Sequence, residues 1–260
     1  MSKMQSKATK ETNAKRAAER AAAVRREQES KERRRRALWV SLAVLAVLAA
    51  VVAISVAVQS SRDSTGDTAT PPDGAVESYA IPYGEATAPV EVAVYEDFMC
   101  PFCGEFEAAS AESLKEYVDR GDVQVRYHVI SFLDGASNGT DYSTRAMNAA
   151  GAVLDTAGPE AAKKFHDLLF ANQPEEGSDG LSDDQLVELA VQAGANEAAV
   201  APAIENRAFE QWVVNASDQA SKDGVNSTPT VQVDGETVEG SSIEDLLART
   251  EGAIDAGLAN

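Results

Sequence analysis

The two cysteines of the chain, Cys100 and Cys103, lie three residues apart at one junction of the sequence. In residues 90–95 valine alternates with other residue types, which is the two-residue period of a β-strand. Residues 105–109, just after the pair, have the composition of a helix. The stretch therefore predicts a strand that passes into a helix with two thiols at the junction, an arrangement suited to thiol–disulfide chemistry.

Cys100 is the better candidate for the reactive thiol. Pro101 lacks an N–H and has a fixed φ, which suits the first position of a helix and makes Cys100 its N-cap. The free amides and the positive end of the helix dipole then stabilise the nucleophilic thiolate. Nearby carboxylates act in the opposite direction, and Phe102 supplies no positive charge. We expect the pKa of Cys100 to be lowered but not extreme, and Cys103, one turn further inside, to be the resolving thiol.

Two other uses of the cysteine pair remain open at this point. A structural disulfide is compatible with an exported chain, but closing so short a loop stabilises little. A zinc site would need two further ligands, and His128 and His166 are the only histidines. Neither lies in a paired ligand spacing, so we interpret His128 as a strand residue and His166 as an ordinary helix residue. We predict no metal and no cofactor beyond the redox-active Cys100–Cys103 disulfide.

Charge is distributed unevenly along the chain. Residues 1–36 hold 13 Lys/Arg and 5 Asp/Glu, whereas residues 37–260 hold 10 and 37. Residues 37–58 contain no charged residue, and a helix of that length, about 33 Å, would cross a hydrocarbon core of roughly 30 Å. The basic residues before this segment predict that residues 1–36 are cytoplasmic and that the rest lies outside. A cleaved signal peptide ending at the small residues 55–57 is the alternative.

The amino-acid composition predicts how the rest of the chain is divided into segments. Residues 1–36 contain no aromatic residue and cannot bury a core, which predicts a basic cytoplasmic tail. Its position beside a membrane segment explains its charge more simply than nucleic-acid binding does. Residues 59–77 are polar and rich in Gly, Pro, Ser and Thr, which predicts a flexible linker. The folded domain is then expected at residues 78–260, on the extracytoplasmic side of the cell membrane.

Hydrophobic periodicity in residues 78–260 indicates an α/β order of strands and helices. Strands are expected at residues 79–82, 90–95 and 123–130, with a hairpin at 230–239 that turns at Asp234 and Gly235. Helices are expected at residues 101–120, 140–156 and 159–172, between a capping box at 182–185 and Gly194, within 196–222, and after 241–244. About a hundred residues separate the third strand from the hairpin, so we expect a helical insertion at about 131–223.

Pro229 is the second candidate feature of a site. It immediately precedes the strand predicted from Thr230, which fits a sheet edge or a cis X–Pro turn. An ordinary turn proline is the simpler alternative. The strand–helix unit with its cysteines upstream and the hairpin–helix unit downstream together favour a role near the thiols.

With these elements in order, the sequence resembles the thioredoxin fold. More narrowly, it resembles the DsbA-like thiol–disulfide oxidoreductases with an inserted helical subdomain, in the membrane-anchored form typical of Gram-positive bacteria, including actinobacteria. One N-terminal transmembrane helix would precede that fold. The resemblance covers about residues 79–258 and is carried by Asp-Phe-Met-Cys-Pro-Phe-Cys at 97–103 and Ser-Thr-Pro-Thr at 227–230.

The resemblance implies roles for individual residues. Cys100 would exchange disulfides with the substrate, and Cys103 would resolve the mixed disulfide. A cis Thr228–Pro229 bond would face the cysteines, and the backbone beside it would hold the substrate chain. The helical insertion would cap the thiol site and shape a groove for unfolded polypeptide.

Two features depart from better-known members of the family. No Trp precedes Cys100, which argues against a thioredoxin-type reductase. Phe102 stands where the best-known DsbA motif has His, which bears on oxidising strength. Pro101 and Phe102 would complete the wall of the active site.

Several neighbours of the cysteines have two interpretations each. Phe98, Met99 and Phe102 could form an apolar rim near the sulfur or belong to the core, and for Phe98 we favour the core. Glu96 and Asp97 could include a buried carboxylate that handles the proton of the resolving thiol. They could equally be ordinary acids at the approach to a helix.

The expected function is an extracytoplasmic thiol–disulfide oxidoreductase that introduces disulfides into exported cysteine-containing polypeptides. By resemblance, a quinone-linked DsbB-like or VKOR-like membrane protein would reoxidise it. The same chemistry run as an isomerase or reductase is one alternative, since direction depends on the reduction potential. A non-catalytic, membrane-anchored binding module with a thioredoxin fold is the other.

Overall fold

The computed structural model describes residues 69–259. The tail predicted at 1–36, the span predicted at 37–58 and residues 59–68 of the predicted linker lie outside the described residues. These assignments stay predictions. Within residues 69–259, no helix combines the length and the apolar character that crossing a membrane requires.

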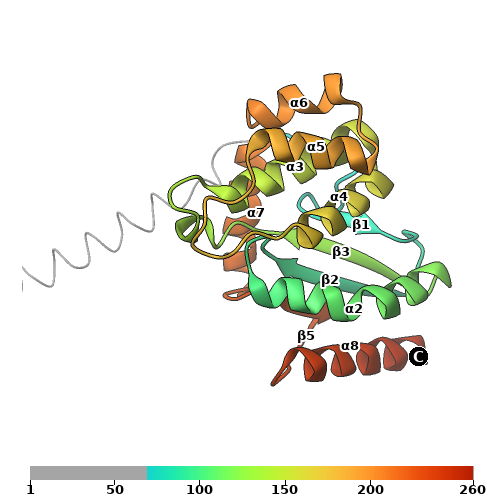
Figure 1. Ribbon diagram of the computed structural model, residues 1–260. Coiled ribbons are helices and arrows are strands. Elements are labelled where there is room, and N and C mark those ends of the chain that lie inside the picture. The colour runs from blue at the N-terminus through green and yellow to red at the C-terminus, as the bar shows by residue number, and fades with distance from the viewer. Residues whose placement is uncertain (1–68, 260) are drawn as a thin grey trace, which may run out of the picture. The chain divides into compact units, whose positions relative to one another are not determined.

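A five-stranded mixed sheet forms the centre of the fold, in the order β1-β3-β2-β4-β5 (Figure 1). Strands β2 (Val90–Glu96) and β3 (Val123–Val129) pair in parallel, and α2 (Pro101–Asp119) connects them. Strand β1 (Ile81–Tyr83) runs antiparallel to β3, β4 (Thr230–Val233) runs antiparallel to β2, and β5 (Glu236–Val238) completes the hairpin. Strand β2 therefore lies between two neighbours, which agrees with its burial over nearly its whole length.

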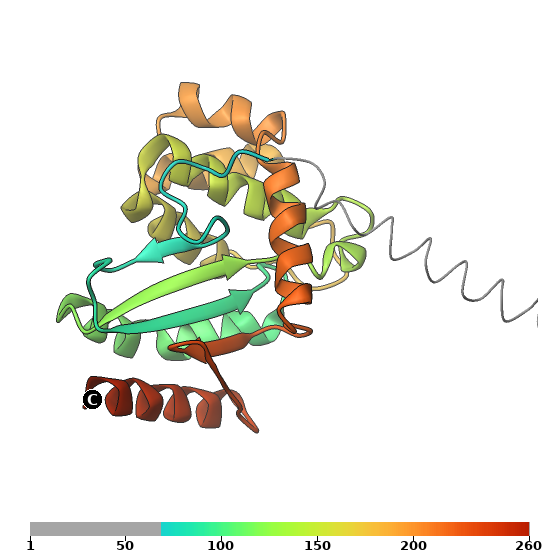
Figure 2. The same cartoon turned by 180° about the vertical axis from the view of Figure 1, so that it is seen from behind.

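Alternation along β2 separates the two faces of the sheet. Val92 and Val94 belong to the main core, to which α2 and α8 (Ile243–Leu258) contribute. Ala93 and Tyr95 belong to a second cluster that includes Ala220 of α7 (Glu210–Lys222). Seen from behind, α7 crosses in front of the sheet, on the side away from α2 (Figure 2). The two-residue period of the sequence thus decides which side chains meet each helical layer.

A helical insertion lies between β3 and β4, as predicted. It contains a 3-10 turn, η1 (Asp134–Ala136), and the helices α3 (Tyr142–Ala157), α4 (Pro159–Ala171), α5 (Asp183–Ala193), α6 (Glu197–Glu205) and α7. Helix α3 is its centre, because every residue from Tyr142 to Leu154 is buried. Much of this stretch is alanine and glycine, which lets neighbouring helices approach it closely on several sides.

Local signals in the sequence produce the expected backbone. Ser182 and Gln185 form the predicted capping box at the start of α5, each side chain accepting from the backbone N–H of the other residue. Gly194 ends that helix with a φ of 116°. Asp234 and Gly235, both with positive φ, make the turn between β4 and β5.

The folded part begins before Ser78, earlier than composition predicted. The backbone N–H of Asp73 donates to a carboxylate oxygen of Asp155 at 2.9 Å. The indole N–H of Trp212 donates to the carbonyl oxygen of Ser78 at 2.6 Å. Residues 69–77, assigned above to the flexible linker, therefore pack on the helical insertion. Hydrogen bonds and small alanine contacts hold a segment that has few large apolar side chains.

Candidate active site

Cys100 caps the N-terminus of α2 with an extended backbone (φ −74°, ψ 116°), and Pro101 follows as the first helical residue, as predicted. The N–H of Cys100 donates to the carbonyl oxygen of Asp97 at 2.9 Å, which closes the turn between β2 and α2. Cys100 retains 5% of its surface, whereas Cys103 is fully buried. Both are free thiols, so the site is in its reduced form.

The Thr228–Pro229 peptide bond is cis, and the loop that contains it lies against Cys100. Strands β2 and β4 pair antiparallel with Tyr95 opposite Thr230, so that the end of one strand lies beside the beginning of the other. Sγ of Cys100 is consequently 3.5 Å from the carbonyl oxygen of Thr228. Two motifs that are 128 residues apart in the chain meet at one place, as the resemblance implied.

Neighbouring hydrogen-bond donors lower the pKa of Cys100 to about 6. The thiol of Cys103 contributes most, burial opposes it, and the Thr228 hydroxyl and the N–H groups of Cys103 and Phe102 add to the lowering. Thr228 serves both ionisation states, because its carbonyl can accept from the thiol while its hydroxyl donates to the thiolate. The predicted lowering is confirmed, although the partner thiol contributes more than the helix end.

The pKa of Cys103 is shifted in the opposite direction, upward. Burial raises its pKa well above the ordinary value, and both the neighbouring Cys100 and the charge of Glu96 add to the rise. At neutral pH the pair therefore consists of a thiolate at Cys100 and a thiol at Cys103. This division suits attack at one sulfur and proton exchange at the other.

Asp97 supports the turn that carries Cys100. One carboxylate oxygen accepts from the N–H of Met99 at 2.9 Å and from the hydroxyl of Ser143 at 2.7 Å. The other accepts from the N–H of Leu133 at 2.9 Å. Burial raises the pKa of Asp97 to about 6, and these hydrogen bonds limit the rise. Because two of its partners are backbone amides, which cannot take up a proton, the contacts favour a positioning role over the proton relay considered above.

Glu96 lies in a buried cluster with His166 of α4 and Glu107 of α2. Nε2 of His166 is 2.5 Å from one carboxylate oxygen of Glu96 and 4.0 Å from one of Glu107. Nδ1 of His166 is 3.1 Å from a carboxylate oxygen of Asp167, whose side chain is 54% exposed. The cluster thus connects a carboxylate that raises the pKa of Cys103 with the protein surface.

This cluster holds protons at neutral pH. Burial, assisted by the charge of Glu96, raises the pKa of Glu107 to about 8. Burial lowers the pKa of His166, but Glu96, Asp167 and Glu107 outweigh it and raise the value to about 9. Both shifts are upward, which favours a charged His166 and a neutral Glu107 at neutral pH. The interpretation of His166 as an ordinary helix residue was wrong, because the fold places it against two carboxylates far away in the sequence.

The same cluster is the group within residues 69–259 whose ligand atoms lie close enough to hold a metal ion, all within 4.8 Å of one another. The cysteines are not part of it. The 2.5 Å between His166 and Glu96 is a hydrogen-bond distance, and an ion between them would have to push these atoms apart. The geometry fits proton storage better than metal binding.

Gln173, which no sequence pattern singled out, holds the active-site turn from the side of the insertion. Its Nε2 donates to the carbonyl oxygen of Cys100 at 2.8 Å and to that of Phe98 at 3.2 Å. A Cβ on residue 104 would lie 2.3 Å from Oε1 of Gln173, so Gly104 leaves the space that this side chain occupies. Gln173 is 73 residues from Cys100, and only the fold brings them together.

The remaining candidates divide between core and surface. Phe98 and Met99 are fully buried in the main core, which confirms the interpretation favoured for Phe98. Phe102 is 60% exposed and is the one predicted rim residue of the three that lies at the surface. His128 is a buried residue of β3 that stacks on Tyr95, and it takes no part in the thiol site.

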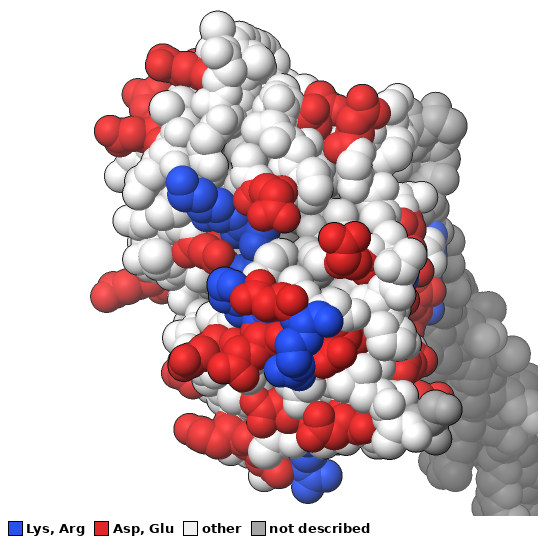
Figure 3. Space-filling model, turned by 90° about the vertical axis from the view of Figure 1, so that its right-hand side faces the viewer, with Lys and Arg blue, Asp and Glu red and all other residues white. Residues whose placement is uncertain are grey.

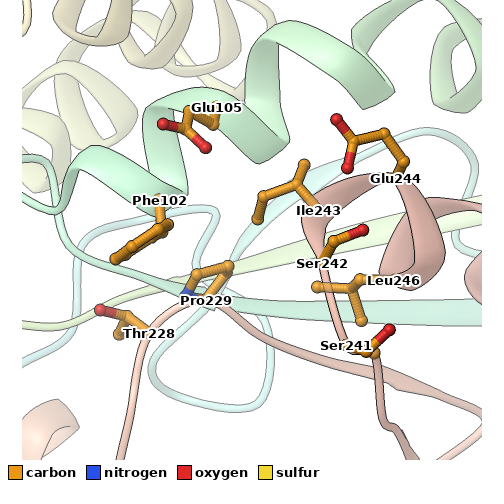
Figure 4. A pocket seen from close by; sticks show the side chains of 10 residues that line it. Phe102, Glu105, Thr228, Pro229, Ser241, Ser242, Ile243, Glu244 and Leu246 are labelled. Carbon is orange, nitrogen blue, oxygen red and sulfur yellow. The ribbon is translucent and has the colours of Figure 1, made fainter.

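A cavity of about 520 Å³ opens beside the thiol site, between α2 and the start of α8 (Figure 4). Phe102 and the Thr228–Pro229 turn line one end of it. Figure 4 shows Ser241, Ser242, Ile243 and Leu246 at the other end. Apolar surface therefore extends from the exposed edge of the thiol site toward the last helix.

Comparison with known proteins agrees with this geometry. The family model described as Thioredoxin matches residues 77–251. Reduced DsbA from Mycobacterium tuberculosis is 30% identical, with 69% of this chain and 98% of that one covered and a TM-score of 0.57. MdbA, a thiol-disulfide oxidoreductase from Corynebacterium diphtheriae, is 26% identical, with 72% and 95% covered and a TM-score of 0.58.

A further relative is the serine/threonine-protein kinase PknE of Mycobacterium tuberculosis, 31% identical over 176 residues. The match covers 65% of this chain but 31% of the kinase, so the chain spans about a third of that protein's length. Together with the reactive thiol pair beside a cis-proline, these matches establish the family. The chain belongs to the thioredoxin family and, within it, to the DsbA-like thiol–disulfide oxidoreductases.

Proposed function

We propose that this oxidoreductase acts as an oxidase that introduces disulfides into exported polypeptides. The observation that carries the proposal is the position of Cys100 at the N-cap of α2, against the Thr228–Pro229 loop and beside the thiol of Cys103. The hydrogen bonds at this position lower the pKa of Cys100 to about 6 and so favour its thiolate at neutral pH. A stabilised thiolate favours the reduced enzyme over its disulfide and so makes the disulfide a stronger oxidant. The fully buried Cys103 is protected from competing thiols, which directs attack to Cys100.

The reaction begins with the oxidised enzyme. A substrate thiolate attacks Sγ of Cys100, the Cys100–Cys103 bond breaks, and Cys103 leaves with the electron pair and takes up a proton. A second substrate thiolate attacks the substrate sulfur of the mixed disulfide and releases Cys100 as a thiolate. The substrate loses two electrons and two protons in forming its disulfide, and the enzyme gains the two electrons.

Glu96 is the proposed proton carrier for Cys103, with His166 and Glu107 as its reservoir. The support is geometric: Glu96 is hydrogen-bonded to a charged His166, which contacts the exposed Asp167 on its other nitrogen. One carboxylate oxygen of Glu96 has no hydrogen-bond partner among the described residues and is free to accept or pass on a proton. The link from Cys103 to Glu96 is electrostatic, since the charge of Glu96 raises the pKa of Cys103. In this proposal a proton passes between that thiol and the surface through Glu96 and His166.

The setting of the reaction is also part of the proposal. Residues 37–58 would anchor the protein as a single-pass membrane protein, with the basic residues 1–36 in the cytoplasm and the catalytic domain outside. The uncharged segment and the charge asymmetry support this topology. Reoxidation would return the two electrons to a quinone through a DsbB-like or VKOR-like membrane partner. The cysteine pair would be the only redox centre.

Trapping the redox state in cells distinguishes the directions of this chemistry. Rapid acidification and alkylation should find the Cys100–Cys103 pair mainly oxidised in an oxidase, and mainly reduced in an isomerase or reductase. A Cys103→Ala variant should accumulate mixed disulfides with exported proteins through Cys100, whereas Cys100→Ala should not. Absence of trapped proteins and of dithiol oxidation would leave only the non-catalytic binding module.

A further inference from the structure

Two carboxylates border the cavity beside the thiol site, Glu105 on α2 and Glu244 in the first turn of α8. Figure 4 shows them projecting from the two helices that flank the cavity. Both side chains are exposed. The other described residues that line the cavity are apolar, glycine, serine or threonine, and no lysine, arginine or histidine is among them.

The local charge of this rim is negative. Within residues 69–259, Glu105 has no ion-pair partner. Glu244 interacts with the Ser242 hydroxyl and with its own backbone N–H, and both lower its pKa and keep it ionised. The N-terminus of α8 adds about half a positive charge, and Asp245 is already paired with Arg249. Two carboxylates against about half a positive charge leave an excess of negative charge.

We propose that this rim, Glu105 and Glu244, selects substrate polypeptides that carry Lys or Arg within a few residues of the reacting cysteine. The inference rests on the proposed function and concerns the same site. A polypeptide whose sulfur reaches Cys100 also lies against Phe102 and the Thr228–Pro229 turn, which form one end of the cavity. The apolar stem of a Lys or Arg side chain suits that lining, and its charged end reaches the rim.

The net charge of the whole domain also favours substrates that carry positive charge. Residues 69–259 carry 9 Lys/Arg and 35 Asp/Glu, a formal net charge of −26. On the face drawn in Figure 3, acidic side chains are more numerous than basic ones. Such a field increases the encounter rate with cationic chains from any direction. The proposal differs from this general attraction because it assigns the selection to two particular carboxylates.

The expected effect is moderate because both carboxylates are exposed. An exposed ion pair changes an equilibrium by at most about fivefold. The comparison of Lys with Glu combines attraction of the one and repulsion of the other, so a substrate with Lys beside the cysteine should have a kcat/KM about three- to tenfold higher than the same substrate with Glu. The ratio should decrease as salt screens the charges.

The test uses the full-length protein in detergent, with Cys100 and Cys103 oxidised to a disulfide. The substrate is a peptide with two cysteines. It is made in three forms, with Lys, Gln or Glu beside the first cysteine. The rates should follow the order Lys, Gln, Glu. The double variant Glu105→Gln/Glu244→Gln should bring the three rates to within about twofold of one another.

Glu112→Gln/Glu251→Gln is the matched control. It removes the same charge from the same two helices, seven residues or about 10 Å further along, and should retain most of the preference. Equal rates for the three peptides in the unmodified protein would overturn the inference and leave the proposed function standing. Equal loss of preference in both double variants would assign the selection to net charge and also overturn it. No oxidation of any peptide would refute the proposed function itself.

Discussion

The side-chain amide of Gln173 donates to the carbonyl oxygen of Cys100 at 2.8 Å, in the space left open by Gly104. The same amide donates to Phe98, so one side chain from the insertion fixes two peptide groups of the turn that presents the thiols. The carbonyl of Cys100 also accepts from the N–H groups of Cys103 and Gly104 at 3.1 and 3.2 Å. The start of α2 is therefore held both from within the helix and from the insertion.

Gly104→Ala should displace Gln173 and destabilise the protein. Loss of its two hydrogen bonds should reduce the free energy of unfolding by about 1–3 kcal/mol, as measured by urea unfolding of the oxidised protein. Gly252→Ala is the control, because residue 252 lies within α8 with open space around it. There, alanine should stabilise by up to about 1 kcal/mol through helix propensity. Equal stabilisation by both substitutions would show that Gln173 contributes nothing at this position.

Cys103→Ala should raise the pKa of Cys100 above its value of about 6, because it removes the strongest hydrogen-bond donor to the thiolate. The value should stay below that of an ordinary cysteine, since the helix amides and Thr228 remain. Ultraviolet absorbance of the thiolate as a function of pH measures both values. The result contradicts the structure if the variant titrates at or below the pKa of the unmodified protein.

Thr228→Val tests the hydroxyl separately. Valine keeps the branched shape and the backbone carbonyl of Thr228 but removes the donor to the thiolate. The pKa of Cys100 should rise, by less than in Cys103→Ala. An unchanged pKa would assign the lowering entirely to Cys103 and the amides of α2.

Stability should decrease with rising pH because of the buried cluster. The folded-state pKa of His166 is raised from 6.5 to about 9, so its contribution is complete below pH 6.5 and is lost as pH rises through 9. The pKa of Glu107 is raised from 4.5 to about 8, so between these pH values the carboxyl is ionised in the unfolded state but neutral in the folded state, and stability also decreases over that range. Unfolding of the oxidised protein, in which no thiol titrates, should be measured between pH 5 and pH 9.

Glu107→Gln should reduce that pH dependence and stabilise the protein at pH 7. A buried group that is neutral in the folded state and charged in the unfolded state opposes folding, and an amide removes this cost, about 1–3 kcal/mol at pH 7. His166→Gln should flatten the decrease between pH 6.5 and 9. An unaltered pH profile in both variants would place the titrating groups elsewhere.

Asp97→Asn should destabilise the protein at pH 7. The asparagine amide would present N–H groups to Met99 or Leu133, which are themselves donors, and a buried donor would lose its acceptor. The expected loss is about 1–3 kcal/mol in the free energy of unfolding. Ser143→Ala removes a single donor from the same carboxylate and should cost less. If the variant is as stable as the unmodified protein, the Asp97 carboxylate does not stabilise the turn.

The local sequence pattern was sufficient to predict most of the helices and strands and the position of the thiol pair. The alternation around Val92 and Val94, the capping box at Ser182 and the turn at Asp234 each depend on a few neighbouring residues, and each formed as expected. The N-cap position of Cys100 also follows from its neighbour Pro101 alone. Features of this kind can be inferred because the physical cause and its effect lie within one or two turns of the chain.

The supporting contacts could not be inferred in this way. His166 has no unusual neighbours in sequence, yet α4 places it 2.5 Å from Glu96, 70 residues away. Gln173 follows the same helix and acts on Cys100 only after α4 has packed. Residues 69–77 have the composition of a linker, and what holds them is largely backbone hydrogen bonding, which composition does not reveal.

The strand order separates the two halves of the thiol site in time as well as in sequence. Cys100 leaves the ribosome long before Thr228, and β4 can take its place beside β2 only when the helices between them have been made. Until then Cys100 lacks Thr228 and the cis-proline wall. A partly synthesised chain consequently carries a Cys100 that already has Cys103 and the amides of α2 beside it but lacks the opposite wall of the site. The enzyme acquires its complete site only when β4 has paired with β2, at about the moment when its own folding is complete.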